Sequence, residues 1–413
     1  MNARSDEARL EEACGLGLAI DLNIVHRTVI SIATPKAGTL IGSGMVETIG
    51  ELIKEQEIDL VIVDHALTPV QQRNLEKAWN TKVIDRTGLI LEIFGRRAKT
   101  REGVLQVELA HLTYQKGRLV RSWTHLERQR GGGGFMGGPG ETQIETDRRL
   151  LQDKIDRLKL ELEQVTRTRM LHRAKRKKVP QPIVALVGYT NAGKSTLFNR
   201  LTGAGVLAEN MLFATLDPTL RKLTLPHGRL CILSDTVGFI SNLPTHLVAA
   251  FRATLEEVIE ADLILHVRDV SDPDTMAQAD DVNRILGDLG IGPDQDEHVI
   301  DIWNKIDLIN SDDRADRFNH LKSGHKNERH IVELSAVTGE GVDRLVDIIE
   351  AKIAGGLEDV RVKLPVSKMA DLGWIYKNSE IVGRKDNKDG SITFDLRMTA
   401  MSSNELKERL ARH

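Results

Sequence analysis

The chain has 413 residues, of which 40% are hydrophobic and 28% are charged, and its formal net charge is −3. These values are typical of a folded protein of two or three domains, and the sequence has no apolar run of the roughly 18 residues that a membrane-spanning helix needs. The polar, acidic start is unlike an ordinary secretory signal, and two cysteines, Cys14 and Cys231, are too few for a disulfide framework or a zinc cage. We therefore expect a cytoplasmic protein with no integral membrane association.

The first 95 residues predict a small α/β domain. Two short apolar runs, residues 16–25 and 58–64, have the composition of buried strands. A helical pattern covers residues 46–56 between them. Thr68 followed by Pro69 predicts an N-cap and the first turn of a helix that ends near Trp79. Strands that alternate with helices in this way are typical of an α/β domain.

The next segment is strongly basic. Residues 1–95 carry 9 Lys and Arg against 14 Asp and Glu, whereas residues 96–178 carry 21 against 10, a net charge of +11. The net charge of residues 179–413 is therefore −9. A basic segment within an otherwise acidic chain indicates a polyanionic partner such as nucleic acid. The alternative is a solvated helical hairpin whose charges serve only solubility.

Two long helices are predicted in this basic segment, on either side of a glycine-rich loop. The first covers residues 87–126, and the second covers residues 142–178. Seven of residues 131–140 are glycine, so this loop cannot hold a regular element. The two helices can pair as an antiparallel hairpin within one chain, so we expect a monomer. The pairing is predicted by apolar residues of the second helix that recur every seventh position, at Ile144, Leu151, Leu158 and Val165.

The glycine-rich loop is expected to be disordered in the free protein and to order on its partner. Phe135 and Met136 lie at its centre and are candidates for contact with exposed bases or apolar crevices of RNA. The alternative is a plain flexible connector.

Beyond Pro180 and Pro182, which mark a domain boundary, the pattern is that of a parallel α/β sheet. Residues 183–188 form a continuous apolar run, and strands alternate with helices as far as about Gly355. The further strands are predicted at residues 229–235, 263–270, 299–304 and 331–335.

The last segment predicts a small α+β domain. It contains a strand at residues 360–364, a helix that opens at Ser367, and a hairpin that turns through residues 386–390. A terminal helix is expected to be capped by Ser402 or Ser403.

A phosphate-binding loop follows the strand at residues 183–188. The sequence GYTNAGKS at residues 188–195 fits the pattern GxxxxGK[ST], with a strand before it and helical residues after it. Its backbone N–H groups and the helix N-terminus favour phosphate. Lys194 is expected to reach the β- and γ-phosphates, and Ser195 to bind Mg²⁺. The nucleotide-binding residues predicted here are Gly188, Tyr189, Thr190, Asn191, Ala192, Gly193, Lys194, Ser195 and Thr196.

Three later segments predict that the base of the bound nucleotide is guanine rather than adenine. Asp235, Thr236, Val237 and Gly238 form a DxxG element at a strand end, in which Asp235 would hold Mg²⁺ through water and the Gly238 amide would sense the γ-phosphate. Asn304, Lys305, Ile306 and Asp307 form an NKxD element at the end of a later strand, where α/β sheets bind ligands. The carboxylate can accept both guanine N1–H and the 2-amino group, which adenine lacks. The segment Ser335, Ala336 and Val337 suits a backbone contact to guanine O6.

A threonine that completes the Mg²⁺ shell when GTP is bound should lie between the first two motifs. The segment there contains five predicted GTP-contacting residues: Phe213, Ala214, Thr215, Leu216 and Asp217. We assign Thr215 to the metal together with Ser195, with Thr219 as the fallback, and the alternative is a polar β-turn before a strand. Lys194, Thr215 and Gly238 are the predicted catalytic residues.

Phenylalanine follows the DxxG element at position 239. Many small GTPases have a glutamine there that orients the attacking water. Phe239 has no hydrogen-bonding group, so hydrolysis by the isolated protein should be slow and should need help from a partner. The alternative is that Phe239 only packs while a neighbouring residue places the water.

The motifs GYTNAGKS, FATLDPT, DTVGF, NKID and SAV, preceded by GGFMGGPGETQIETDRRLL, together resemble the HflX family of translational GTPases over nearly the whole chain. The resemblance implies a multidomain α/β protein. Its P-loop GTPase domain (181–356) would follow a small α/β domain (1–95) and a basic helical hairpin (96–180), and would precede a small α+β domain (357–413).

The resemblance also implies a function. The protein would bind GTP, GDP and Mg²⁺, contact the large ribosomal subunit and its RNA through the hairpin and the glycine-rich loop, and split or rescue stalled ribosomes under stress. The alternative is a GTP-switched scaffold that binds protein or membrane partners through the hairpin.

Overall fold

The structure is a computed structural model that describes residues 4–129, 139–176, 181–204, 212–213, 215–241, 252–292, 297–324, 329–354 and 357–411. Phe135, Met136 and most of the predicted glycine-rich loop lie outside these ranges. The chain divides into two compact units. One comprises Met1–Lys178, Glu209–Asp217 and Val237–Leu255, and the other comprises Val179–Ala208, Pro218–Thr236 and Glu256–His413.

The first unit opens with the predicted small α/β domain. Its two strands pair in parallel, with Leu60 opposite Lys82. Thr68 caps the helix that follows the first strand, because its side chain accepts the Gln71 N–H while the Gln71 side chain accepts the Thr68 N–H. The second strand lies in a segment for which the sequence predicted none. The elements are α1 (Asp6–Leu18), α2 (Ser43–Glu55), β1 (Leu60–Val63), α3 (Pro69–Trp79), β2 (Lys82–Asp85) and α4 (Arg86–Arg97).

The strand predicted at residues 16–25 is wrong, because α1 occupies the first part of that run. Ser5 accepts the Ala8 N–H as the N-cap, and two acidic residues in the first turn favour the positive end of the helix. Leu16, Ala19 and Ile20 are buried. A short apolar run therefore marks a buried helix end here, a case that periodicity alone cannot distinguish from a strand.

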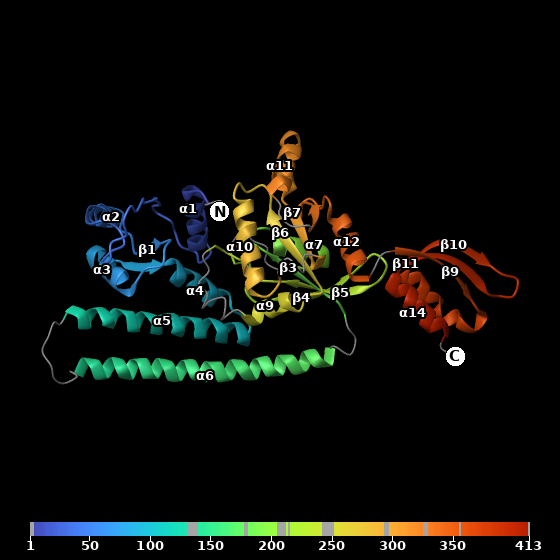
Figure 1. Cartoon of the computed structure of the whole chain (residues 1–413), viewed down its shortest axis with the longest axis horizontal. Helices are drawn as coiled ribbons and strands as arrows, with labels where there is room; N and C mark the ends of the chain where they lie inside the picture. Colours follow the sequence, from blue (N-terminus) through green and yellow to red (C-terminus); the bar gives the residue numbers. More distant parts are fainter. Residues whose placement is uncertain are drawn as a thin grey trace. The chain divides into compact units, whose positions relative to one another are not determined.

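Two long helices, α5 (Arg101–Gln129) and α6 (Pro139–Arg176), run side by side (Figure 1). The single helix predicted from residue 87 is wrong, because the chain leaves the helix at residues 98–100, between α4 and α5. Of the predicted apolar seam, Leu158 is buried in the hairpin, as is Ile155. The Tyr114 hydroxyl donates to Asp85 at 2.6 Å and Arg118 pairs with the same carboxylate at 3.2 Å, so α5 is fastened to the α/β domain.

The second unit contains a six-stranded sheet with the order β4-β5-β3-β6-β7-β8. Five strands are parallel, as predicted, but β4 is antiparallel to β5 and was not predicted. Arg221 and Lys222 of β4 are exposed, as suits the edge of a sheet. The strands are β3 (Ile183–Gly188), β4 (Thr219–Thr224), β5 (Leu230–Asp235), β6 (Leu263–Asp269), β7 (Val299–Asn304) and β8 (His330–Glu333).

Helices join the strands of this sheet. The core between the helices and the sheet is built from aliphatic side chains such as Leu186, Leu197 and Leu345, which are all fully buried. In the described part of the chain, no helix is both long enough and apolar enough to cross a membrane. The helices are α7 (Lys194–Thr202), α9 (Arg252–Ile259, of which residues 252–255 belong to the first unit), α10 (Thr275–Asp288), α11 (Ser311–Gly324) and α12 (Val342–Ala354).

The C-terminal module is a three-stranded antiparallel sheet with the order β10-β11-β9 and two helices. The helix predicted from Ser367 is a 3₁₀ segment followed by α13. The predicted cap of the last helix is also wrong, because Thr399 Oγ1 accepts the Ser402 N–H at 3.2 Å while Ser402 and Ser403 are buried within the first turn. The elements are β9 (Leu357–Leu364), α13 (Leu372–Asn378), β10 (Glu380–Asp386), β11 (Ile392–Thr399) and α14 (Ala400–Ala411).

The turn between β4 and β5 is fixed to α12 and to the C-terminal module. The buried Glu350 carboxylate accepts the His227 N–H at 3.1 Å and lies 2.7 Å from His227 Nδ1. Gly228 has φ 78°, and a Cβ atom there would overlap the Lys377 carbonyl oxygen. Only glycine satisfies both constraints at this turn.

Changing Gly228→Ala should therefore lower the free energy of unfolding by about 2 kcal/mol or more, because it adds a backbone overlap to the cost of a positive φ. Gly290→Ala is the matched control: Gly290 has φ 88° but no atom within 4 Å of its Cβ position, so its cost should be about 1 kcal/mol. Chemical denaturation of the two variants measures the difference. Equal losses would contradict the packing of the turn against Lys377.

Candidate nucleotide-binding site

The predicted phosphate-binding loop joins the central strand β3 to α7, and its glycines are sterically required. Gly188 has φ 151°, and a Cβ there would overlap the Val267 carbonyl oxygen. Gly193 has φ 92°, and a Cβ there would overlap Asn304 Nδ2. The loop therefore lies in close contact with β6 and with the end of β7, at the carboxyl edge of the sheet where such folds bind ligands.

Lys194 is the first residue of α7 and is buried. Its Nζ donates to the Gly188 carbonyl oxygen at 3.1 Å and to the Tyr189 carbonyl oxygen at 2.7 Å. Burial lowers the pKa of Lys194 to about 8, although the neighbouring Asp235 carboxylate acts in the opposite direction. The ammonium group is thus held against the loop, where it can meet the phosphates of a nucleotide.

A hydroxyl in the first turn of α7 and a carboxylate at the end of β5 lie together and are suited to Mg²⁺. Ser195 Oγ donates to Asp235 Oδ2 at 2.7 Å, and Asp235 ends β5, which pairs with β3. Oxygen ligands of this kind are the ones that Mg²⁺ prefers. Within the described ranges, no group of three or more His, Cys, Asp or Glu side chains offers an alternative metal site.

The Asn304 carboxamide joins the phosphate-binding loop to the segment after β8. Its Nδ2 donates to the Ala192 carbonyl oxygen at 2.8 Å, and its Oδ1 accepts the Ala336 N–H at 2.9 Å. Arg200 Nε adds a hydrogen bond to the Ala336 carbonyl oxygen at 2.6 Å. The sequence pointed to Asn304 through its motif but gave no signal for Arg200, whose partner is 136 residues away.

The other residues of the NKxD element and of the Ser335 segment make local contacts. Lys305 has φ 65° and pairs with Asp269 at 2.7 Å. Ile306 is buried, whereas the Asp307 side chain is exposed. Ser335 is buried, and its Oγ accepts the Thr338 N–H at 3.0 Å. The structure thus gathers the loop, Asp235, the NKxD element and the Ser335 segment at one edge of the sheet.

Other predicted site residues belong to the first unit. Phe213 and Leu216 are buried there, and the Asp217 carboxylate accepts hydrogen bonds at the start of α5. Ala214 lies outside the described residues. The fallback residue Thr219 belongs to the second unit, where it is the register partner of Asp235 in the sheet. Thr215, Val237 and Gly238 also belong to the first unit.

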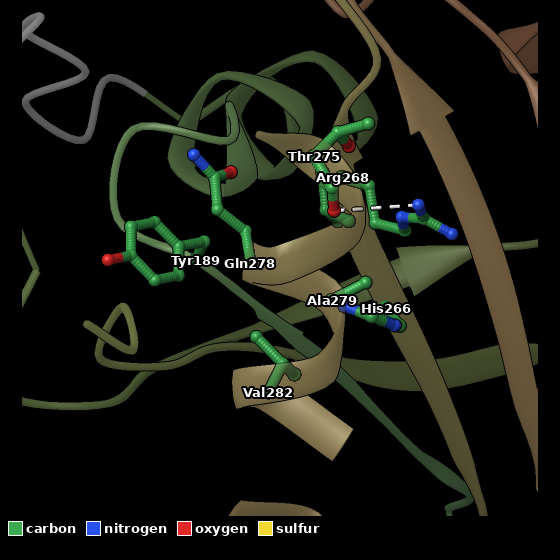
Figure 2. A pocket seen from close by; sticks show the side chains of 8 residues that line it. Tyr189, His266, Arg268, Thr275, Gln278, Ala279 and Val282 are labelled. Atoms are coloured by element: carbon green, nitrogen blue, oxygen red, sulfur yellow. Dashed lines mark hydrogen bonds between the residues drawn. The ribbon is translucent and has the colours of Figure 1, made fainter. Parts of the chain in front are cut away.

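A narrow pocket lies beside Tyr189, between β6 and α10 (Figure 2). Arg268 Nη2 lies 3.5 Å from the Thr275 carbonyl oxygen on its wall. Apart from Tyr189, its lining contains no residue of the nucleotide motifs. The lining residues are Tyr189, His266, Val267, Arg268, Thr275, Gln278, Ala279 and Val282.

The polar wall of this pocket belongs to a buried charge cluster around Asp301. His266 Nδ1 lies 3.1 Å from Asp301, and Arg268 and Arg329 each lie 3.7 Å from it. Burial alone would raise the pKa of Asp301, but these three groups hold it at about 2. The cluster is therefore a structural tie between β6, β7 and the residue before β8.

Four family models match the chain. Residues 7–95 match "GTP-binding GTPase N-terminal", residues 97–176 match "GTP-binding GTPase Middle Region", residues 183–305 match "50S ribosome-binding GTPase", and residues 320–413 match "HflX C-terminal domain".

Curated relatives match over most of their length. The chain is 50% identical to the GTPase HflX of Magnetococcus marinus over 92% of this chain and 86% of the relative. It is 44% identical to the GTPase HflX of Escherichia coli over 88% and 83%. Among solved structures, a GTP-binding protein of Sulfolobus solfataricus in complex with GDP matches with 24% identity and a TM-score of 0.45, over 84% of this chain and 96% of that one.

The lowered pKa of Lys194 predicts how nucleotide binding depends on pH. Below pH 8 the lysine of the free protein is charged and binds phosphate at full strength, and above pH 8 binding must first take up a proton. Nucleotide affinity should therefore fall as the pH rises from 8 to 9.5, with proton uptake on binding, as isothermal titration calorimetry in two buffers can measure. Lys194→Arg stays charged throughout and should show neither effect. A wild-type affinity that is flat across this range would contradict the assignment.

Proposed function

The chain belongs to the HflX family of GTPases, and we propose that it uses the GTP cycle to act on the large ribosomal subunit, where it splits or rescues stalled ribosomes under stress. The family match makes it a GTP-binding and GTP-hydrolysing protein. The main support for a ribosomal role is that residues 183–305 match the family model described as a 50S ribosome-binding GTPase.

The helical hairpin supplies a surface for such a partner. Its helices have 29 and 38 residues, which corresponds to lengths of about 43 and 57 Å at 1.5 Å per residue. The segment that contains them has a net charge of +11. Arg148, Arg149 and Arg157 of α6 are exposed, and exposed basic side chains of this kind bind the phosphates of RNA.

The geometry of the site supports the following roles. Lys194 would bind the β- and γ-phosphates, and Ser195 and Asp235 would hold Mg²⁺. The sequence motifs, rather than the geometry, assign Thr215 to the Mg²⁺ shell and the Gly238 amide to the γ-phosphate. The metal, when bound, neutralises the charge that develops on the transferred phosphoryl group.

Base recognition is assigned to the NKxD element. Asp307 accepts guanine N1–H and the 2-amino group, for which its exposed carboxylate is suited. The Ala336 N–H donates to Asn304 Oδ1 at 2.9 Å, which fixes the segment of Ser335, Ala336 and Val337, and another backbone N–H of this segment would reach guanine O6.

Phe239 supports a division of labour between the protein and its partner. Its ring is 2% exposed and carries no polar atom, so it cannot orient water. Lys194, Mg²⁺ and the loop amides stabilise charge, and the group or ordering that places the water comes from the bound large subunit. Binding alone can achieve this by raising the population of the productive geometry.

Changing Asp307→Asn replaces one acceptor oxygen by a donor amide that opposes guanine N1–H but matches xanthine. We expect GTP affinity to fall by roughly a hundredfold or more and xanthosine triphosphate to bind in its place. The control Asp316→Asn alters another exposed aspartate, on α11, and should leave both affinities unchanged. Equilibrium binding with labelled nucleotides measures both affinities in each variant. Retained GTP affinity in the Asp307 variant would refute the base assignment.

Purified large subunits should raise the single-turnover rate of GTP hydrolysis by about tenfold or more. A triple change of Arg148, Arg149 and Arg157 to Gln should weaken this stimulation and make binding to the subunit less dependent on salt, because fewer counterions are then released. GTP affinity should not change.

The matched control removes three exposed basic residues of the α/β domain, Lys54, Arg73 and Lys77, and should keep the full stimulation. Hydrolysis that is equally fast with and without subunits would refute partner activation. If the protein binds no subunit in the presence of a non-hydrolysable GTP analogue, but binds membranes or a protein partner, the scaffold function replaces the ribosomal one.

A further inference from the structure

The start of α5, the first helix of the hairpin, is held by a carboxylate from far along the chain. Asp217 Oδ2 accepts the Lys99 N–H at 2.8 Å and the Thr100 N–H at 2.9 Å. Its Oδ1 accepts the Thr100 hydroxyl at 2.5 Å. We call these three hydrogen bonds the α5 latch. They place a negative charge at the positive end of a 29-residue helix.

The local structure at the start of α5 is shaped for this contact. Thr100 Oγ1 accepts the Gly103 N–H at 3.0 Å while it donates to Asp217, so one hydroxyl caps the helix and binds the carboxylate. A Cβ atom at Gly103 would overlap Asp217 Oδ1. Any other residue at position 103 would push the carboxylate away from the helix.

The residues before Asp217 pack on the same unit. Phe213 is 3% exposed, and its ring lies 4.8 Å from that of Phe94 in α4, edge to face. Leu216 is 2% exposed. The latch is therefore the polar part of a larger attachment, in which the segment that contains Thr215 is anchored by two buried side chains and one carboxylate.

The segment after the DxxG element is attached to the same α/β domain. Arg86 Nη2 donates to the Ser241 carbonyl oxygen at 3.0 Å, and Arg4 Nη1 donates to Ser241 Oγ at 3.2 Å. Glu12 pairs with both arginines at 2.5 Å. Both segments that respond to the γ-phosphate in P-loop GTPases thus contact the N-terminal domain.

The chain between the latch and the metal-binding residues is short. Thr215 precedes Asp217 by two residues, and only Pro218 separates Asp217 from Thr219, the partner of Asp235 in the sheet. Two residues span at most about 7 Å. The latch carboxylate is thus joined by at most two residues of chain to both threonines that the sequence assigns to Mg²⁺.

We propose that Asp217 is a positioning residue that couples the nucleotide state of residues 213–219 to the helical hairpin through the N-terminus of α5. The latch stabilises one position of this segment, so a nucleotide state that needs another position breaks it and uncaps α5. Linkage requires the reverse as well: a partner that displaces the hairpin changes the affinity for GTP relative to GDP by the same factor. The effect of a partner on nucleotide affinity rests on the proposed function. The effect of the nucleotide on α5 concerns the free protein alone.

The variants break the latch from both sides. Thr100→Val removes the hydroxyl without touching a residue assigned to the nucleotide, and Thr100→Ser retains the hydroxyl. Asp217→Asn keeps the shape of the side chain and removes its charge. Asp389→Asn is the matched control, because Asp389 also accepts one hydroxyl at 2.5 Å and one backbone N–H at 3.0 Å, both from Ser391 in the C-terminal module.

Hydrogen exchange of the backbone amides at residues 99–104 provides the first test, in the full-length protein without ribosomes. With Mg²⁺, exchange should differ by about threefold or more between GDP and a non-hydrolysable GTP analogue, the size expected for a lost cap. Thr100→Val and Asp217→Asn should abolish this difference, and Thr100→Ser and Asp389→Asn should keep it. A wild-type protein whose exchange ignores the nucleotide, or a Thr100→Val variant that keeps the full difference, overturns the proposal.

The ratio of GTP-analogue to GDP affinity, measured with and without large subunits, provides the second test. In the wild type the subunit should change this ratio by about threefold or more, and in Thr100→Val the change should be lost. A wild-type ratio that does not respond to subunits counts against the ribosomal function and leaves the exchange result to decide the coupling. A Thr100→Val ratio that responds as the wild type does overturns the coupling through Asp217.

Discussion

The carboxamide of Asn304 is the interaction on which the nucleotide site depends. It donates to the Ala192 carbonyl oxygen and accepts the Ala336 N–H, so it sets the spacing between the phosphate-binding loop and the segment after β8. A carboxamide offers a donor and an acceptor in one rigid plane, and this one is 1% exposed, where hydrogen bonds are strong. Gly193 leaves room for it. The ends of β3, β7 and β8 are thereby held at a spacing suited to a nucleotide.

Signals that act over a few residues carried most of what the sequence could predict. The buried strands β3, β6 and β7 are continuous apolar runs because both faces of a central parallel strand are covered. The capping box at Thr68 and the glycine pattern of the phosphate-binding loop are equally local. The family resemblance, read from the same motifs, agrees with the match to HflX models and relatives.

Contacts between distant residues explain what the sequence could not predict. The helix break at residues 98–100 is stabilised by Asp217, 117 residues after Thr100, and nothing near it in the sequence signals this. The strand β4 lies at the edge of the sheet and exposes Arg221 and Lys222, so it lacks the apolar run of a central strand. The apolar run at residues 16–25 suggested a strand because a buried helix end has the same composition.

The attachment of the β4–β5 turn has a consequence for how the second unit unfolds. Gly228 packs against the Lys377 carbonyl oxygen of the C-terminal module, and Glu350 of α12 binds the neighbouring His227, so the module and the six-stranded sheet share a packing contact as well as a covalent connection. Modules joined in this way lose each other's support when either one opens. The sheet and the C-terminal module should therefore behave as one cooperative foldon, with amide protection in β9 and β11 rising and falling together with that of β5.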